Sequence, residues 1–146
     1  CDYSGFGRLF HTQSLRRVFM EQVLKKLTLE FFGEGKHKIE PEKLLHLEDA
    51  CLLDVRSKEE AGAVSISLES IPGVECVNIP INEIPDRMGE IPKEKTIGVF
   101  CPANVRSGIV YAFLLSKGFS SVFVVEGGYA ALTDAIKPGK ILKLIS

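Results

Sequence analysis

The sequence predicts an α/β fold in which a parallel sheet carries helices on both faces. Short apolar runs alternate with helical segments over residues 36–146, which is the pattern of repeated strand and helix units. The run at residues 50–55 is almost continuously apolar, as in a strand that is buried on both faces. The prolines between residues 72 and 102 stand at the edges of these segments, where a missing N–H disrupts least.

The elements can be placed in order along the chain. The predicted strands are residues 50–55, 76–79, 96–101 and 121–125. The predicted helical or turn segments are residues 41–47, 57–62, 81–88 and 106–117.

An N-terminal extension at residues 1–35 precedes the domain that we expect at residues 36–146. An apolar residue recurs every fourth position in Leu15, Phe19, Val23, Leu27 and Phe31. This period predicts an amphipathic helix over residues 14–32, with Ser14 as N-cap and Gly33 at its end. We expect its apolar face to cover one side of the domain, or else to contact a protein partner or a second copy.

Composition excludes several classes of function. A length of 146 residues favours one domain core, and 18 basic against 19 acidic residues give a net charge of -1, so no general attraction to nucleic acid is expected. No apolar run reaches the roughly 20 residues of a membrane span. The chain begins at Cys1 and not at Met, which indicates a processed or truncated form, with a lipid-bearing cysteine as the alternative.

The cysteines point away from metals and disulfides. They stand at positions 1, 51, 76 and 101, without the close spacing of a zinc site or a redox dithiol. We expect reduced thiols in a cytoplasmic protein. Cys51 and Cys76 lie in apolar strand patterns, which indicates packing rather than chemistry.

Cys101 stands apart because it ends a predicted strand and precedes a loop and a helix. Ligands bind at the carboxyl ends of parallel strands, and backbone N–H groups at a helix start stabilise anions. The same field lowers the pKa of a thiol, so Cys101 is the candidate nucleophile. The candidate substrate-binding residues are those of the loop and helix start, Ala103, Asn104, Val105, Arg106 and Ser107. Among them Asn104 suits a left-handed turn, and Arg106 can orient an anionic substrate.

Five short motifs resemble the rhodanese family in the expected order, over roughly residues 38–140. They are Leu-Leu-Asp-Val-Arg-Ser at 52–57, Ile-Pro-Gly-Val at 71–74, Asn-Ile-Pro at 78–80, the Cys101 loop, and Val-Glu-Gly-Gly-Tyr at 125–129. The resemblance implies a five-stranded parallel sheet and a persulfide on Cys101. It also implies thiosulfate or a similar sulfur donor, and a loop supported by Asp54 and Arg56. We expect a thiol or cyanide as acceptor, and no cofactor or metal.

Two other functions stay open from the sequence. One is a protein phosphatase or arsenate reductase resembling the Cdc25 type. Four residues separate Cys101 from Arg106, whereas such phosphatases have five, which favours sulfur transfer. The other is a non-catalytic interaction module. Pro102, which lacks an N–H beside the nucleophile, and the additional N-terminal helix keep that alternative open. The presence of Cys101 and Arg106 argues against it.

Overall fold

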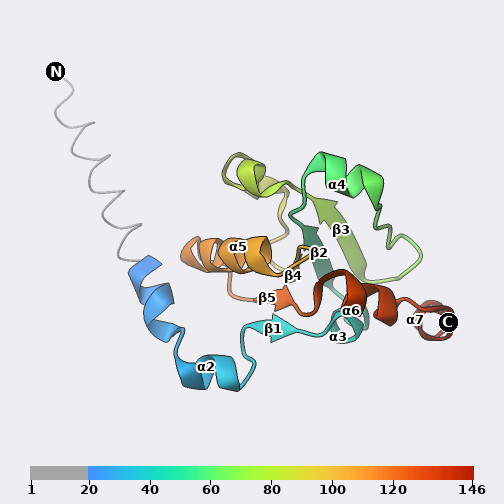
Figure 1. Ribbon diagram of the computed structural model, residues 1–146, viewed down its shortest axis with the longest axis horizontal. Coiled ribbons are helices and arrows are strands. Elements are labelled where there is room, and N and C mark those ends of the chain that lie inside the picture. The colour runs from blue at the N-terminus through green and yellow to red at the C-terminus, as the bar shows by residue number, and fades with distance from the viewer. Residues whose placement is uncertain (1–19) are drawn as a thin grey trace.

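The computed structural model describes residues 20–146, and within them five parallel strands form a sheet in the order β1-β5-β4-β2-β3 (Figure 1). The strands are β1 (Lys38–Ile39), β2 (Ala50–Asp54), β3 (Val74–Asn78), β4 (Thr96–Phe100) and β5 (Val122–Val125). Every neighbouring pair is parallel. The predicted α/β class and the five-stranded sheet are confirmed.

Helices connect the strands, as expected for parallel pairs, which need crossover connections. They are α2 (Leu29–Gly33), α3 (Pro41–Leu45), α4 (Lys58–Ala63), the 3₁₀ turns η1 (Ile81–Asp86) and η2 (Met88–Glu90), α5 (Val105–Ser116), α6 (Gly128–Ala135) and α7 (Pro138–Ile145). The predicted helix at residues 106–117 agrees with α5 to within one residue at each end. The strand β1 and the helices α6 and α7 were not predicted from the sequence.

Two hydrophobic clusters cover the two faces of the sheet, because successive side chains of a strand point to opposite faces. Cys51 and Leu53 of β2 belong to the cluster beneath α5. Leu52, between them, belongs to the cluster that includes residues of α3 and α6. All three side chains are fully buried. The sheet is therefore enclosed by helices on both sides, which explains the continuous apolar run at residues 50–55.

The single helix predicted over residues 14–32 is wrong in its described part. Residues 20–26 are helical, the chain is extended at Thr28, and α2 starts anew at Leu29. The Thr28 side chain accepts a hydrogen bond from the Phe31 N–H at 3.2 Å, which caps α2 and makes the break favourable. The expected N-cap Ser14, together with Leu15, Phe19 and Cys1, lies outside the described residues.

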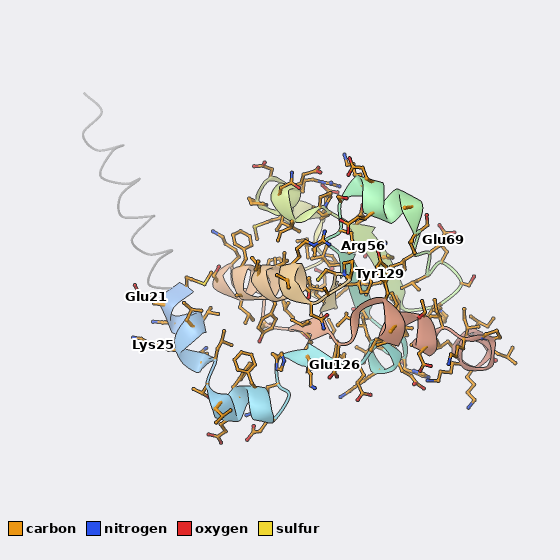
Figure 2. The ribbon with its side chains drawn as sticks, viewed as in Figure 1. Glu21, Lys25, Arg56, Glu69, Glu126 and Tyr129 are labelled. Carbon is orange, nitrogen blue, oxygen red and sulfur yellow. The ribbon has the colours of Figure 1, made fainter. Side chains whose placement is uncertain are left out.

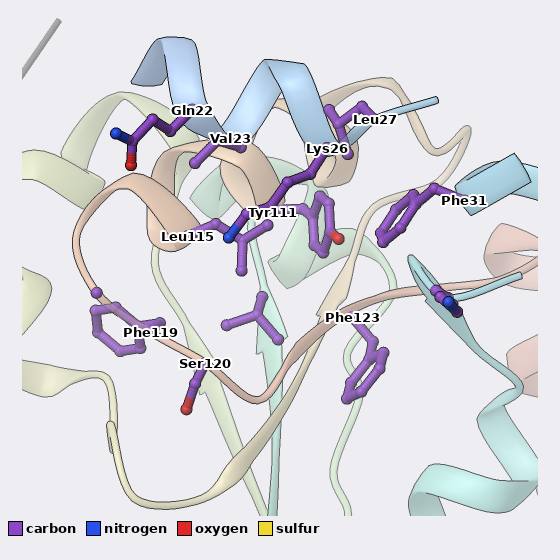
Figure 3. A pocket seen from close by; sticks show the side chains of 13 residues that line it. Gln22, Val23, Lys26, Leu27, Phe31, Tyr111, Leu115, Phe119, Ser120 and Phe123 are labelled. Atoms are coloured by element: carbon purple, nitrogen blue, oxygen red, sulfur yellow. The ribbon is translucent and has the colours of Figure 1, made fainter. Parts of the chain in front are cut away.

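Three apolar side chains in the described part of the N-terminal extension pack against the domain, whereas Leu24, Leu29 and Phe32 are exposed. Val23 is buried, and Leu27 and Phe31 pack half-buried against the cluster beneath α5. A cavity of about 440 Å³ lies beside them, with Tyr111 and other residues of α5 and β5 in its far wall (Figure 3). No helix within residues 20–146 is long and apolar enough to cross a membrane. A partner contact through residues 14–32, like the boundary at residue 35, remains a prediction.

Replacing Leu53 with alanine tests the central packing. Leu53 is fully buried in β2, so Leu53→Ala should lower the free energy of unfolding by about 2–5 kcal/mol, from lost burial and a residual cavity. Leu29→Ala is the matched control, because Leu29 is 89% exposed, and its effect should stay within about 0.5 kcal/mol. Urea denaturation followed by circular dichroism measures both. Equal effects in the two variants would contradict the assigned core.

Candidate active site

Cys101 lies directly after β4, which has neighbours on both sides in the sheet, so the thiol sits at the middle of the carboxyl edge. Its side chain is buried, with 1% exposed. The chain then turns through Pro102 and Asn104 into α5. Asn104 takes the left-handed conformation with φ 63°, the one non-glycine residue within residues 20–146 with a positive φ. This turn points the first amides of α5 back toward the sulfur.

The sulfur of Cys101 accepts hydrogen bonds from the loop and the helix start. The Ser107 N–H donates to Sγ at 3.3 Å, and the Ser107 hydroxyl lies at 3.3 Å from the same sulfur. Burial acts to raise the pKa of the Cys101 thiol. Hydrogen bonds from the Ser107 hydroxyl and from the N–H groups of Ser107, Ala103 and Arg106 outweigh burial, so its pKa lies below the ordinary value.

The N–H groups that act on the sulfur belong to residues 103, 106 and 107, so the donors present do not include position 102. The Pro102 carbonyl instead packs closely on Gly128 at the start of α6. A Cβ built on Gly128 would lie 2.0 Å from the Pro102 oxygen, and Gly128 also has a positive φ of 58°. Only glycine fits here without displacing the cysteine loop.

A buried ion pair stands next to the loop. Arg56 is fully buried, and its Nε and Nη2 donate to the Asp54 carboxylate at 2.9 and 2.7 Å. Its Nη1 donates to the Val64 carbonyl at 2.8 Å and to the Tyr129 hydroxyl at 2.9 Å. Figure 2 shows Arg56 and Tyr129 side by side. The hydrogen bond with Asp54 is the main cause of the raised pKa of Arg56.

Aromatic rings enclose this guanidinium. Its carbon lies 5.6 Å from the centre of the Phe100 ring and 5.5 Å from that of Tyr129, distances at which a cation is attracted to a ring. Phe100 directly precedes Cys101. Asp54 and Arg56 therefore hold the strand ends and the start of α6 around the loop, without offering a free charge to a substrate.

Arg106, which the sequence predicts to orient an anionic substrate, is paired with a carboxylate of the protein itself. Its Nη1 and Nη2 donate to the two carboxylate oxygens of Glu60 at 2.6 and 2.9 Å. Glu60 lies on α4, and its Oε1 also accepts the Ser57 N–H at 3.1 Å in a capping box. Arg106 thus joins the start of α5 to α4.

Three residues of the site were missed by sequence reasoning. Tyr129 and Gly128 stand in the motif at 125–129, but their contacts with Arg56 and Pro102 join distant parts of the chain. The sequence does contain a capping-box pattern, in which Ser57 is followed three positions later by Glu60. This pattern predicts the start of a helix, but it does not predict the ion pair with Arg106. The five loop and helix-start residues singled out earlier all lie at the carboxyl edge with Cys101, and Asp54 and Arg56 lie beside them.

The other two thiols have a different environment. Cys51 and Cys76 are both free, and burial raises the pKa of Cys51 to about 12 and that of Cys76 to about 11. No group of three or more histidine, cysteine or acidic side chains within residues 20–146 could hold a metal ion.

The fold and the loop define an α/β protein whose buried thiol is surrounded by the N–H groups of residues 103, 106 and 107, a set of donors that we call the cradle. Comparison places this protein in a family. The model of the rhodanese-like domain family matches residues 40–135. A sulfurtransferase of Allochromatium vinosum is 32% identical over 90 residues, covering 62% of this chain and 78% of that protein. The YtwF protein of Bacillus subtilis is 34% identical over 103 residues, covering 70% of this chain and 87% of that one.

A solved structure agrees with these sequence matches. A rhodanese-related protein from Thermoplasma volcanium has a TM-score of 0.55 at 25% identity, over 70% of this chain and 95% of that one. The chain therefore belongs to the rhodanese-like domain family, and its single-domain homologues include sulfurtransferases.

Thiol labelling tests the electrostatics of the cradle. In a Cys1→Ser background, iodoacetamide should label Cys101 first, with a midpoint on the pH axis below the value of about 8.5 for a free thiol. The sign follows from the thiolate, which is the reacting form: a lowered pKa moves the midpoint down, and labelling slows as pH falls through it. Peptide mass spectrometry identifies the labelled residue, with Cys51 and Cys76 as internal controls. A midpoint at or above the free-thiol value contradicts the cradle.

Substitution of Gly128 tests the contact between α6 and the loop. Gly128→Ala should destabilise the fold by about 1–3 kcal/mol, because the new Cβ meets the Pro102 carbonyl and the residue has a positive φ. It should also raise the labelling midpoint of Cys101 by displacing the loop donors. Gly62→Ala is the control, since its Cβ would meet nothing within 4 Å. An unchanged midpoint in a folded Gly128→Ala protein would rule out this coupling.

Proposed function

We propose that Cys101 carries sulfur as a persulfide, which it takes from thiosulfate or a similar donor and passes to a thiol or cyanide. The observation that supports this most directly is the geometry at the start of α5, where the Ser107 N–H donates to the buried Cys101 sulfur at 3.3 Å. The hydrogen bonds of the loop lower the pKa of this thiol in the same sense. A buried thiol without such donors has a raised pKa, as Cys51 does. Membership of the rhodanese-like family supports the same chemistry.

The reaction proceeds in two balanced steps. The Cys101 thiolate attacks the outer sulfur of thiosulfate, the S–S bond of the donor breaks, and sulfite leaves with the electron pair. Cyanide or a thiolate then attacks the outer sulfur of the persulfide, and the Cys101 thiolate leaves. The amides of Ala103, Arg106 and Ser107 stabilise negative charge on sulfur in both steps.

The loop is expected to discriminate between sulfur and phosphate. Between Cys101 and Arg106 stand four residues, and the first of them, Pro102, has no N–H. A phosphoryl group with three equatorial oxygens needs more donors than a single transferred sulfur atom. The Arg106 guanidinium is also held by Glu60, which leaves it less available to clamp a phosphate. These features favour sulfur transfer over a phosphatase.

Intact-mass spectrometry after incubation with thiosulfate tests the function. The wild type should gain the mass of one sulfur atom, and cyanide or dithiothreitol should remove it. Cys101→Ser should gain none and lose thiocyanate formation, whereas Cys51→Ser and Cys76→Ser, once shown to be folded, should retain most of both. Loss of sulfur transfer in a folded Cys51→Ser or Cys76→Ser protein would assign the nucleophile to that cysteine instead of Cys101. Cys101-dependent hydrolysis of an aryl phosphate by the wild type would instead support the phosphatase.

A further inference from the structure

An ion pair between Glu60 and Arg106 lies next to the cysteine loop, at the start of α5. Arg106 stands in the first turn of α5, where its own N–H contributes to the sulfur site. Its guanidinium is bound in a bidentate manner by the Glu60 carboxylate, and both side chains are about one third exposed, 34% and 37%. The positive charge in the first turn of α5 is thus paired with a negative charge from α4.

Glu60 is itself fixed by its position in α4. Its backbone N–H donates to the Ser57 hydroxyl at 3.2 Å, while its Oε1 accepts the Ser57 N–H at 3.1 Å. The hydrogen bond from Arg106, followed by that from the Ser57 N–H, lowers the pKa of Glu60 to about 2. The carboxylate therefore remains charged throughout the neutral range and holds Arg106 in place.

The second arginine near the loop adds no free charge either. Arg56 is fully buried and paired with Asp54 at 2.7 Å. The formal charges of the two arginines and their two carboxylate partners sum to zero. The attraction for an anion therefore comes from the loop amides and the start of α5. That attraction suits one negative charge on sulfur better than two charges on a small donor.

The surface beside Arg106 is apolar. Val105 and Ile109 lie one turn apart on α5 and are 68% and 58% exposed. Such side chains contact the carbon skeleton of an organic donor more favourably than the oxygens of a sulfonate.

We propose that Glu60 is a specificity-determining residue, which acts through Arg106 to favour a persulfide carried on an organic thiol over thiosulfate. This inference rests on the proposed function and names its donor class. The Cys101 thiolate attacks the outer sulfur of R–S–SH, the donor S–S bond breaks, and R–S⁻ leaves with the electron pair. The outer sulfur keeps its proton, so Cys101 ends as Cys–S–SH and no other reactant is required.

The variant Glu60→Gln isolates the charge. Glutamine retains the acceptor of the capping box, so α4 should keep its start. With the negative charge gone, Arg106 is free to bind a dianion. The KM for thiosulfate should fall by about 5-fold with little change in kcat, and added salt should reduce the gain. The KM for glutathione persulfide should change by less than about 2-fold, because this donor bears no second charge at its sulfur.

Two further variants complete the experiment. Glu60→Asp keeps the charge and should keep the wild-type ratio of kcat/KM for the two donors. Glu59→Gln removes the same charge one position away on α4, where no ion pair with Arg106 exists, and should leave the ratio unchanged. If the wild type transfers sulfur and Glu60→Gln leaves the ratio unchanged, the role of Glu60 is overturned while the function stands. A wild type that takes sulfur from neither donor overturns both.

Discussion

The site depends on one buried cation, the guanidinium of Arg56. Taking such a charge out of water costs several kcal/mol, so it is retained only where its donors and its charge are satisfied. Arg56 meets this condition through the Asp54 carboxylate, the Val64 carbonyl and the Tyr129 hydroxyl. These partners belong to the end of β2, the end of α4 and the start of α6. One side chain therefore fixes three segments around the cysteine loop, and loss of either charge would leave the other buried and unpaired.

Close packing and backbone conformation also fix the cysteine loop. The Pro102 carbonyl is held against Gly128, and Asn104 supplies the left-handed turn into α5. With both ends of the loop fixed, its amides stay directed at the sulfur before any substrate arrives, which is the condition for electrostatic stabilisation without reorganisation. The loop is thus positioned from three sides, by the sheet, by α6 and by its own backbone.

The sequence predicted the regular elements better than the contacts between them. The inner strands and α5 follow from apolar runs and helical period, whereas β1 has only two residues and gives no pattern. The four-residue period of Leu27 and Phe31 continues across the break at Thr28, so periodicity alone could not reveal it. Cys101 and its loop were predicted because a strand, a cysteine, a loop and a helix follow one another directly along the chain. Glu60 and Tyr129 were not, because their roles arise from partners 46 and 73 residues away.

Hydrogen-bond donors explain why Cys101 differs in chemistry from Cys51 and Cys76. Cys51, Cys76 and Cys101 all border the sheet, and removal from water opposes the thiolate at each. At Cys51 and Cys76 that effect prevails, so the charged form is suppressed. At Cys101 hydrogen bonds from Ser107 and from the N–H groups of the loop replace the lost water. Fixed donors at a buried thiol stabilise the anion without the reorganisation that water would require. The burial that suppresses the thiolate at two cysteines is therefore offset at the third, where the loop and the start of α5 supply hydrogen bonds.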